Sequence, residues 1–377
     1  MKVLMTGGGT GGHVYPALAI AEIIKTNIPD SEIAFVGTER GIENKLVTKA
    51  GYTLYHVEIQ GFARSLSPKN LRTAYLVLTS PAKAKKIIEE FQPDIVIGTG
   101  GYVCWPLLQA ASSMGIPSMV HESNAAPGLA VKMLQKRLDV ILTNFEETVR
   151  LLKTDRKVVN VGNPLRIKYG AIDRDTARER LGIDKKKFVL LSFGGSIGAE
   201  GINFEALEIM EKLTSKREDM LHYHASGSRF FEEFSKDMTE KGLDKCENIV
   251  VSDYIYDMPL YMAAADVVMC RAGAMTLSEI AMLGKPSVLV PSPYVTDDHQ
   301  YKNAKVVADG GGALLVREEK DTVKGGHSCV EALEAVERLY NDSDLRSKIG
   351  KAVSAFARPD SGKRIYEEII RITKIKK

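Results

Sequence analysis

The sequence predicts an α/β protein made of two Rossmann-like, doubly wound parallel sheets. Short apolar stretches alternate with longer amphipathic stretches along the whole chain. A glycine-rich turn follows the first strand of each half, and a length of 377 residues suits two domains. Crossover helices between short buried strands are the usual connections of a parallel sheet.

The first half begins with an apolar strand at Lys2–Thr6. The turn Gly7–Gly12 and a helical pattern over Pro16–Lys25 follow it, and proline suits the first turn of a helix. The other strands expected in this half are Glu32–Val36, Asp94–Ile97, Ser118–His121 and Val140–Thr143. This alternation predicts one parallel sheet covered by helices.

The second half repeats the same order of elements. A strand at Phe188–Phe193 leads into the turn Gly194–Ala199 and a helix over Asn203–Leu213. The other strands expected here are Met220–Ala225, Ile249–Val251, Val267–Cys270 and Ser287–Val290. Each half therefore opens with a strand, a glycine turn and a helix.

Turn-forming residues at Val161–Pro164 separate the halves. We expect an N-terminal domain over residues 1–163 and a C-terminal domain over residues 164–356. Residues 357–377 are predicted as a terminal helix, and the pattern leaves open whether it returns to the N-terminal domain.

Composition excludes several classes of protein. Hydrophobic residues make up 44% and charged residues 26% of the chain, which allows sizeable cores. The net charge of +3 gives no indication of a nucleic-acid partner. The four cysteines are scattered, which favours reduced thiols over zinc ligation or disulfides. No apolar run approaches about 18 residues, so we expect any membrane contact to be peripheral.

Each glycine turn is a candidate anion site. Glycine allows the backbone to approach a phosphate closely, and the following helix offers N–H groups and a positive dipole end. Gly7, Gly9 and Gly12 also fit the dinucleotide pattern G-x-G-x-x-G. An NAD site would need an acid at the end of the second strand, whereas Glu39 lies beyond Gly37-Thr38. Glycines that serve only close packing remain an alternative.

Polar residues follow several of the strands. His13 lies at the mouth of the first candidate anion site, where an imidazole is a candidate general base. His121–Asn124 follows another strand and is a further candidate site. In Cys270–Glu279 a strand gives way to a helix, and Glu279 is either a ribose ligand or a plain first-turn acid. Asp297–Gln300 is either a surface turn or part of the site.

The metal-binding patterns are weak. Asp173-x-Asp175 and Asp342-x-Asp344 have the spacing of metal-dependent sugar-nucleotide sites, but neither follows an apolar strand. His222 and His224 would lie on one side of a strand without a third ligand. We therefore expect no metal site.

The segment from Ser67 to Phe91 predicts an amphipathic helix. Leu71, Tyr75 and Leu78 share one of its faces, and the segment also carries five basic residues, Lys69, Arg72, Lys83, Lys85 and Lys86. An ordinary core helix and a surface that rests on anionic lipid are both compatible with this pattern.

Six motifs together resemble the MurG family of peptidoglycan β-N-acetylglucosaminyltransferases. They occur in the family's order and span nearly the whole chain: Gly8–His13, Gly100–Val103, His121–Asn124, Gly162–Arg166, Gly194–Ala199 and Arg271–Glu279. The resemblance implies a GT-B fold, with two Rossmann-like domains facing a cleft. It implies inverting transfer of GlcNAc from UDP-GlcNAc to the 4-hydroxyl of MurNAc in lipid I (undecaprenyl-pyrophosphoryl-MurNAc-pentapeptide). The products would be lipid II and UDP, with no cofactor and no obligatory metal.

The resemblance also assigns residues. Ser196 and Arg166 would contact the donor diphosphate, Ile255 the uracil through its backbone, Glu279 the ribose and Gln300 the GlcNAc. The other donor-binding residues would be Thr10, Gly11, Gly12, Asn124, Ala274, Met275, Thr276, Leu277 and Ser278. Gly8, Gly9 and Tyr102 would bind the acceptor.

The general base would be His13 or, as second choice, Glu122. This chain departs from the family at His299 and Ser123, where glutamine is usual, so sugar contacts near His299 are less firmly assigned.

The implied partners are UDP-GlcNAc, lipid I, an anionic membrane surface at the cytoplasmic face of the cell membrane, and proteins of cell-wall assembly. Four other functions stay open at this stage. The chain could use another lipid acceptor such as diacylglycerol, or act as a UDP-GlcNAc 2-epimerase. It could also be a NAD-dependent dehydrogenase or a nucleotide-binding module without catalysis.

Overall fold

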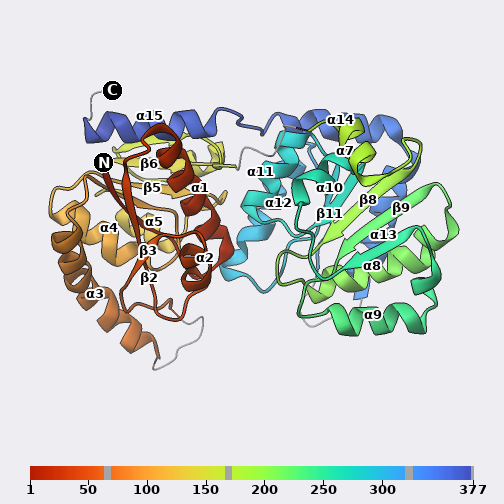
Figure 1. Ribbon diagram of the computed structural model, residues 1–377, viewed down its shortest axis with the longest axis horizontal. Coiled ribbons are helices and arrows are strands. Elements are labelled where there is room, and N and C mark those ends of the chain that lie inside the picture. Colours follow the sequence, from red (N-terminus) through yellow and green to blue (C-terminus); the bar gives the residue numbers. More distant parts are fainter. Residues whose placement is uncertain (63–68, 166–171, 319–325, 375–377) are drawn as a thin grey trace. The chain divides into compact units, whose positions relative to one another are not determined.

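The computed structural model describes residues 1–62, 69–165, 172–318 and 326–374 (Figure 1). The chain forms two compact units. Unit 1 comprises Met1–Leu165 and Arg358–Lys377, and unit 2 comprises Arg166–Ala357. These limits lie within two residues of the expected limits at 163 and 356, and they place the C-terminal tail with unit 1.

Unit 1 contains a seven-stranded parallel sheet in the order β3-β2-β1-β4-β5-β6-β7. Its strands are β1 (Lys2–Thr6), β2 (Glu32–Gly37), β3 (Thr53–His56), β4 (Ile95–Gly98), β5 (Ser118–Glu122), β6 (Val140–Thr143) and β7 (Lys157–Asn160). The strand order reverses between β1 and β4, and ligands of such sheets bind beside this reversal.

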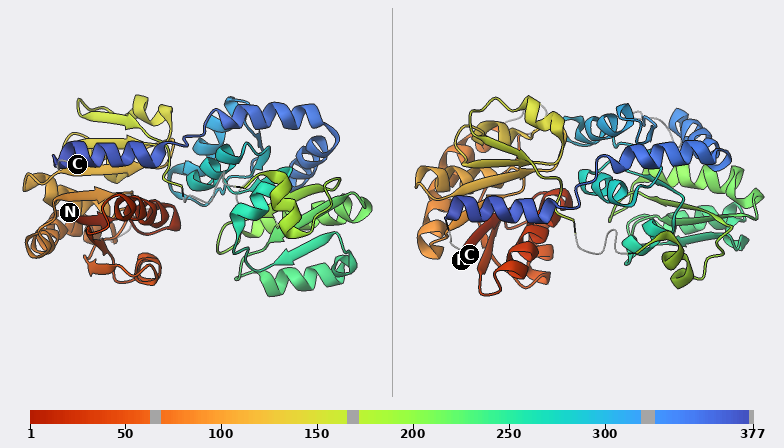
Figure 2. Two further views of the ribbon diagram at one scale, coloured as in Figure 1. Left: turned by 45° about the horizontal axis from the view of Figure 1, so that its top comes forward. Right: turned by 90° about the horizontal axis from the view of Figure 1, so that it is seen from above.

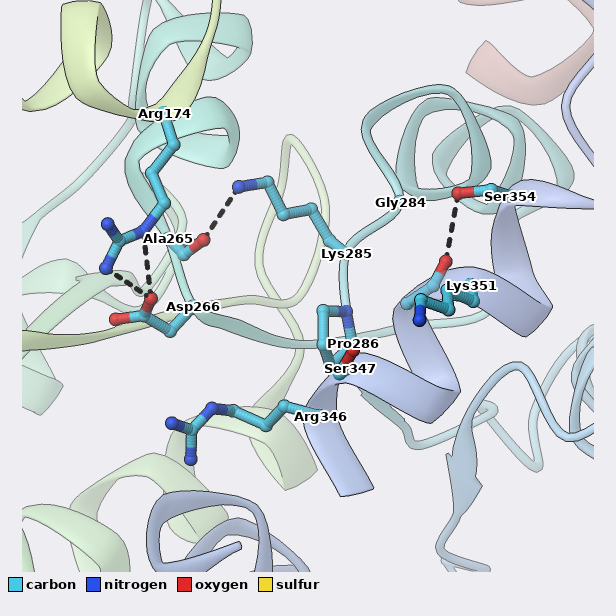
Figure 3. A pocket seen from close by; sticks show the side chains of 11 residues that line it. Arg174, Ala265, Asp266, Gly284, Lys285, Pro286, Arg346, Ser347, Lys351 and Ser354 are labelled. Carbon is cyan, nitrogen blue, oxygen red and sulfur yellow. Dashed lines mark hydrogen bonds and ion pairs between the residues drawn. The ribbon is translucent and has the colours of Figure 1, made fainter. Parts of the chain in front are cut away.

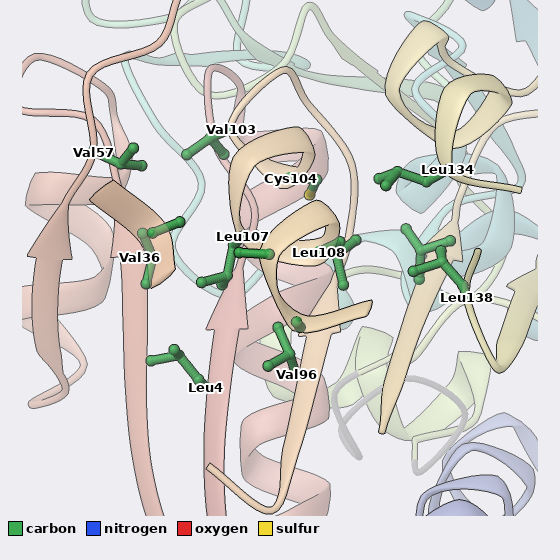
Figure 4. Close-up of a cluster of buried hydrophobic side chains, with 14 of the residues drawn as sticks. Leu4, Val36, Val57, Val96, Val103, Cys104, Leu107, Leu108, Leu134 and Leu138 are labelled. Atoms are coloured by element: carbon green, nitrogen blue, oxygen red, sulfur yellow. The ribbon is translucent and has the colours of Figure 1, made fainter. Parts of the chain in front are cut away.

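Helices cover both faces of this sheet. They are α1 (Gly11–Asn27), α2 (Glu43–Lys49), α3 (Lys69–Phe91), α4 (Cys104–Ser113), α5 (Leu129–Leu134), α6 (Glu146–Leu151) and α15 (Ser361–Thr373). Successive residues of β1 point to opposite faces, so Leu4 packs with Leu107 and Leu108 of α4 (Figure 4). Val3 and Met5 belong to the core on the other face.

The terminal helix α15 packs on unit 1, alongside α1 (Figure 2). Its apolar stripe buries Ile365 and Ile369 in the core that contains Val3 and Met5. This contact answers the question that the sequence left open, because the tail completes one face of the first sheet.

Unit 2 contains a six-stranded parallel sheet in the order β10-β9-β8-β11-β12-β13. Its strands are β8 (Phe188–Phe193), β9 (Met220–Ala225), β10 (Ile249–Ser252), β11 (Val267–Cys270), β12 (Ser287–Leu289) and β13 (Leu314–Leu315). Its helices are α7 (Arg174–Leu181), α8 (Glu200–Lys212), α9 (Phe231–Glu240), α10 (Met258–Ala264), α11 (Ala274–Leu283), α12 (His299–Asp309), α13 (Gly326–Asn341) and α14 (Ser343–Ser354). Single 3₁₀ turns lie at Thr214–Lys216, Leu243–Lys245 and Thr296–Asp298.

All ten predicted strands are confirmed, with ends that differ by one residue at most. The sequence analysis missed β3, β7 and β13, each of which lies at an edge of its sheet. Helices α1 and α8 begin earlier than predicted, because α1 starts at Gly11 within its glycine turn and α8 starts directly after its own. No helix in the described parts of the chain combines the length and apolar character needed to cross a membrane.

Candidate functional site

The candidate site residues of unit 1 lie at the carboxyl ends of three neighbouring strands. Gly7–Gly12 follows β1, Gly100–Tyr102 follows β4, and His121–Asn124 spans the end of β5. Parallel sheets bind their ligands at this edge. The fold therefore gathers three motifs that lie far apart in the sequence.

The buried carboxylate of Glu43 holds the first glycine turn. Its Oε2 accepts the Gly9 N–H at 3.1 Å, and its Oε1 accepts the backbone N–H and the hydroxyl of Thr38 at 2.9 and 2.8 Å. A Cβ atom on Gly8 would lie 2.8 Å from the carboxyl group, so only glycine allows this approach. Sequence reasoning missed Glu43, because a single acid at the start of a short helix carries no motif.

His13 lies in the first turn of α1 and is fixed by Thr99. The ring Nδ1 lies 3.1 Å from the carbonyl oxygen of Thr99, and the Thr99 hydroxyl donates to the carbonyl oxygen of His13 at 2.7 Å. Because a carbonyl oxygen only accepts, Nδ1 carries the proton, and Nε2 is the basic nitrogen of the neutral ring. A side chain on Gly100 would overlap the imidazole. The fold therefore sets both the position and the tautomer of the His13 ring.

Tyr102 lies beside the first glycine turn. A Cβ atom on Gly9 would lie 3.2 Å from the Cε1 atom of its ring. Partial burial, and next the nearby Glu43 carboxylate, raise the pKa of the Tyr102 hydroxyl. The phenol therefore stays protonated at neutral pH and can donate a hydrogen bond at the turn.

The carboxylate of Glu122 is buried within its own loop. Oε1 accepts the backbone and side-chain N–H groups of Asn124 at 3.0 and 3.1 Å, and Oε2 accepts the Gly128 N–H at 2.8 Å. Burial raises the pKa of the Glu122 carboxyl group, and the hydrogen bonds from Gly128 and Asn124 oppose this shift. Both oxygens thus help to shape the loop that presents Asn124.

His121 links the end of β5 to the segment that leaves unit 1. Its Nε2 donates to the carbonyl oxygen of Gly162 at 2.9 Å. Burial lowers the pKa of His121 to about 4, so the ring is neutral at physiological pH. Gly162 adopts a φ of +81°, which favours glycine at this position.

The second glycine turn, Gly194–Ala199, leads from β8 into α8. Ser196 lies exposed in this turn. Gly198 has a φ of +84°, and a Cβ atom on it would lie 3.0 Å from the Cα atom of Gly227. Among the described residues no side chain caps the N-terminus of α8. The first-turn N–H groups and the helix dipole therefore favour an anion beside Ser196.

A chain of buried hydrogen bonds lies beneath this turn. The Asn203 amide donates to the carbonyl oxygen of Ser226 at 3.1 Å, and its oxygen accepts from His224 Nε2 at 3.2 Å. His224 Nδ1 then accepts the Ser192 hydroxyl at 2.8 Å, and the Ser192 oxygen accepts from His222 Nε2 at 2.7 Å. Burial lowers the pKa of both imidazoles, that of His224 to about 3. The two histidines therefore form a neutral structural network.

The run Arg271–Glu279 passes from β11 into α11. Arg271 donates to the carbonyl oxygen of Val290 at 3.0 Å and forms an ion pair with Glu318. The side chains of Ala274 and Leu277 are buried in unit 2, so these residues could meet a ligand only through their backbone. Four side chains of the run Arg271–Glu279 are partly exposed, those of Met275, Thr276, Ser278 and Glu279.

Ile255 lies in the loop that follows the edge strand β10. Its side chain is buried, whereas the flanking Tyr254 and Tyr256 are exposed and form an edge-to-face ring pair. The buried side chain anchors the loop. The backbone of Ile255 is therefore the part suited to recognising a ligand.

Gln300 lies in the first turn of α12, after β12. Its Oε1 accepts the Ser292 N–H at 2.9 Å, and His299 Nδ1 donates to the carbonyl oxygen of Thr296 at 2.8 Å. The preceding residues Asp297 and Asp298 have φ values of +55° and +51°. Such left-handed conformations are uncommon outside glycine and gather at functional sites.

The remaining expectations concern Arg166 and metals. Arg166 lies outside the described residues. Asp173 caps α7 by accepting the Thr176 N–H at 2.9 Å, and Asp342 caps α14 by accepting the Leu345 N–H at 2.8 Å. In the parts of the chain that the structure describes, no group of three His, Cys, Asp or Glu side chains is arranged to hold a metal ion.

Two family models match the chain. The model of the glycosyltransferase family 28 N-terminal domain matches residues 3–143. The model of the glycosyltransferase family 28 C-terminal domain matches residues 189–353. The two matches fall on the first and second sheets, respectively.

Curated relatives match over their full length. A protein of Acetivibrio thermocellus is 41% identical over 379 residues, which covers 100% of this chain and 99% of the relative. A protein of Caldanaerobacter subterraneus is 39% identical over 373 residues, which covers 99% and 100%. Both are named UDP-N-acetylglucosamine–N-acetylmuramyl-(pentapeptide) pyrophosphoryl-undecaprenol N-acetylglucosamine transferase.

Solved structures share the architecture. A crystal structure of MurG from Acinetobacter baumannii matches with a TM-score of 0.77 and 27% identity, over 98% of this chain and 99% of that chain. A UDP-GlcNAc 2-epimerase from Neisseria meningitidis, bound to UDP-GlcNAc, matches with a TM-score of 0.64 and 16% identity, over 98% and 100%. The epimerase likeness concerns the fold alone.

Replacing Glu43 by Gln is expected to loosen the first glycine turn. An amide nitrogen would oppose the N–H of Gly9 or the donors of Thr38, and such a buried mismatch costs about 1–3 kcal/mol. Hydrogen exchange of the Gly7–Gly12 amides should accelerate by about 5- to 150-fold. The matched control Glu39→Gln, at an exposed position, should leave exchange unchanged. Wild-type exchange in E43Q would show that the carboxylate does not hold the turn.

Acidification is expected to destabilise the protein through three histidines that are buried in the described parts of the chain, His121, His222 and His224. Their folded pKa values are lowered, whereas histidine in an unfolded chain protonates near pH 6.5. Below that pH the unfolded state binds more protons, so the free energy of unfolding falls by about 1.4 kcal/mol per pH unit for each histidine.

Urea denaturation at pH 7 and pH 5 measures this loss. The variant His224→Asn should show a shallower pH dependence, because one of the three groups is absent. Equal stability of the wild-type protein at both pH values would contradict the assignment of neutral rings.

Proposed function

The chain belongs to glycosyltransferase family 28, and from this premise we propose that it transfers N-acetylglucosamine from UDP-GlcNAc to a lipid-linked N-acetylmuramyl-pentapeptide. Relatives that match the whole chain at 38–41% identity carry this activity in their names. The acceptor is lipid I, undecaprenyl-pyrophosphoryl-MurNAc-pentapeptide, and the products are lipid II and UDP. The fold is GT-B.

One structural observation carries the proposal. Each sheet presents a glycine turn and a helix N-terminus at the carboxyl ends of its strands, at Gly7–Gly12 and Gly194–Ala199. Each substrate carries a diphosphate, so two anion sites match two substrates. A single dinucleotide site would leave the second turn without a ligand.

We assign most of the donor contacts to unit 2, and the others to Thr10, Gly11, Gly12 and Asn124 of unit 1. Ser196 and the first turn of α8 face the diphosphate, together with Arg166. The backbone of Ile255 recognises uracil, Glu279 accepts hydrogen bonds from the ribose hydroxyls, and Gln300 contacts the sugar. The partial exposure of Glu279 supports its role. On unit 1, Gly8, Gly9 and Tyr102 are assigned to the acceptor.

The proposed reaction is an in-line displacement with inversion. His13 Nε2 takes the proton of the MurNAc 4-hydroxyl while that oxygen bonds to the anomeric carbon of GlcNAc. The bond from this carbon to the UDP oxygen breaks, and its electron pair leaves with UDP. N–H groups at the starts of α8 and α11 stabilise the developing charge without an obligatory metal. The tautomer of His13 supports its choice over Glu122, whose two oxygens both accept N–H bonds.

The direct test is transfer of radiolabelled GlcNAc from UDP-GlcNAc to a short-chain lipid I analogue. Label is expected in the lipid I product, and EDTA should leave the rate unchanged. Parallel reactions use UDP-glucose as donor or diacylglycerol as acceptor. Saturable UDP-GlcNAc binding without transfer to lipid I would overturn the proposed acceptor, and transfer to diacylglycerol alone would replace it.

Replacing His13 by Ala is expected to lower turnover by about 100- to 10,000-fold, the usual contribution of a general base. UDP-GlcNAc affinity should change little, because the His13 imidazole is assigned to the acceptor hydroxyl and not to the donor. Steady-state kinetics and titration with UDP separate the two effects. A loss of turnover below about tenfold, or about 1.4 kcal/mol, would remove His13 as the base.

We further propose that unit 1 rests peripherally on the cytoplasmic face of the cell membrane through α3. One face of this helix packs into the core through Leu76, Ala84 and Ile88. The opposite face carries Leu71, Tyr75 and Leu78, whose exposed fractions are 78%, 64% and 81%. These three side chains are therefore not the core face of an ordinary amphipathic helix. Undecaprenyl in the relatives' names supports a membrane-bound acceptor.

Basic side chains accompany this apolar face. Arg72 and Lys83 both pair with Glu58, at 2.7 and 3.6 Å, and Lys86 lies exposed on the same helix. Arg72 and Lys83 together outweigh the single charge of Glu58, and the net positive charge favours anionic lipid. The apolar side chains of α3 would enter the boundary between the lipid headgroups and the acyl chains.

The double variant Leu71→Ser, Leu78→Ser is expected to lower co-sedimentation with phosphatidylglycerol vesicles at least tenfold. Each leucine contributes about 1.5–3 kcal/mol when fully buried, and partial insertion of two suffices for this effect. Leu151→Ser, at an exposed leucine of α6, is the matched control and should bind as the wild type does. Unchanged vesicle binding of the double variant would discard this docking surface.

A further inference from the structure

A cavity of about 380 Å³ lies within unit 2 (Figure 3). Helices α7 and α14 contribute to its wall, together with the residues that precede β11 and β12. Asp266 directly precedes β11, and Pro286 directly precedes β12. The cavity therefore lies at the amino ends of these strands, the opposite edge from the proposed donor site. Its volume falls within the range of small-molecule sites, roughly 300–1,000 Å³.

Three cations line this cavity without a carboxylate partner among the described residues. Lys285 Nζ donates to the carbonyl oxygens of Ala263 and Ala265 at 2.6 and 2.8 Å. Arg346 donates to the carbonyl oxygen of Tyr340 at 2.9 Å. Lys351 lies exposed near the end of α14. Carbonyl oxygens satisfy N–H donors but do not neutralise charge, so the cavity carries a positive excess.

The carboxylate of Asp266 does not remove this excess. Its Oδ1 accepts Arg174 at 2.9 Å, and its Oδ2 accepts Arg178 at 2.6 Å and the Val189 N–H at 2.8 Å. Two guanidinium groups thus already surround the Asp266 carboxylate, and Arg174 also pairs with the exposed Asp175 at 3.5 Å. Lys285, Arg346 and Lys351 add their charges to this arrangement.

One face of α14 adds polar side chains, although the Ser354 hydroxyl already donates to the carbonyl oxygen of Gly350 at 2.9 Å. Ser347, Lys351 and Ser354 are spaced by four and three residues, so they lie along a single face of the helix. All three line the cavity, and Arg174 and Lys285 line it from other elements (Figure 3). Hydroxyl and ammonium groups together suit the oxygens of a phosphate.

We propose that this cavity binds a small, soluble anion that carries phosphate groups. Partly buried cations without counter-charges are costly, and a multiply charged anion would compensate several of them at once. The site is independent of the proposed transferase activity. The cavity nevertheless adjoins α11, because Gly284 and Lys285, which line it, directly follow the C-terminus of this helix. The other end of α11 carries the residues assigned to the donor.

Lys285 gives this site a pH dependence. Burial lowers the pKa of its ammonium to about 8, Arg174 and Arg178 lower it further, and Asp266 opposes them. An anion beside Lys285 favours the protonated form. Binding is therefore expected to be tighter at pH 7 than at pH 9.

The test is calorimetric titration of the full-length protein with inorganic pyrophosphate. Saturating UDP, whose binding is titrated separately, blocks the proposed donor diphosphate site. Saturable binding is expected in the wild-type protein. Lys351→Glu replaces an attractive charge by a repulsive one and should weaken binding at least about tenfold. Lys348→Glu is the matched control, since Lys348 is an exposed lysine of the same helix and does not line the cavity.

Each outcome decides the proposal. Saturable binding that K351E weakens and K348E does not would support it. Absence of saturable binding, or equal binding by K351E and K348E, would overturn it. A third arm uses phosphatidylglycerol vesicles. If K351E lowers vesicle binding while pyrophosphate does not bind, the phosphate belongs to a lipid headgroup, and the proposal of a soluble ligand is wrong.

Discussion

The close approach of backbone to backbone at the carboxyl ends of β1 and β8 is the constraint on which the rest of the site depends. Each of these strands begins the connection to a helix that must start within a few residues of the sheet. At Gly198 and Gly227 the two backbones touch, and at Gly8 the backbone lies against a carboxyl group. Side chains at these positions would push the helix N-terminus away from the edge where its N–H groups can meet an anion.

The two turns are supported by different buried groups. The first rests on the carboxylate of Glu43, which accepts the Gly9 N–H. Beneath the second, His222 and His224 stay neutral around Ser192. The carboxylate of Glu318 also lies against Gly201 in the first turn of α8, and it is paired with Arg271. In the proposed reaction the departing UDP gains negative charge, and the ion pair limits the repulsion that Glu318 would exert on it.

The sequence predicted what depends on local pattern and missed what depends on tertiary contact. Nine of the ten predicted strands are central and mainly apolar, and only β10 lies at a sheet edge. The missed strands β3, β7 and β13 lie at sheet edges, where partial exposure mixes polar residues into the pattern. The sequence analysis identified the glycine turns and the motifs that follow the strands. It did not identify Glu43 and Thr99, because these residues contact Gly9 and His13 across 34 and 86 residues of sequence.

Burial and hydrogen bonding distinguish candidate residues that the sequence alone does not distinguish. His13, His121 and Glu122 all lie near the carboxyl ends of strands of one sheet, and each side chain is of a type that can act as a base. His121 is buried, with its Nε2–H bound to the carbonyl oxygen of Gly162. Glu122 uses both oxygens within its own loop. Of the three, His13 has a ring that is partly exposed, and its Nδ1–H donates to the carbonyl oxygen of Thr99, which makes Nε2 the basic nitrogen of the neutral ring. These observations support the proposal that His13 accepts the proton, because a general base must be accessible to the hydroxyl group that it deprotonates.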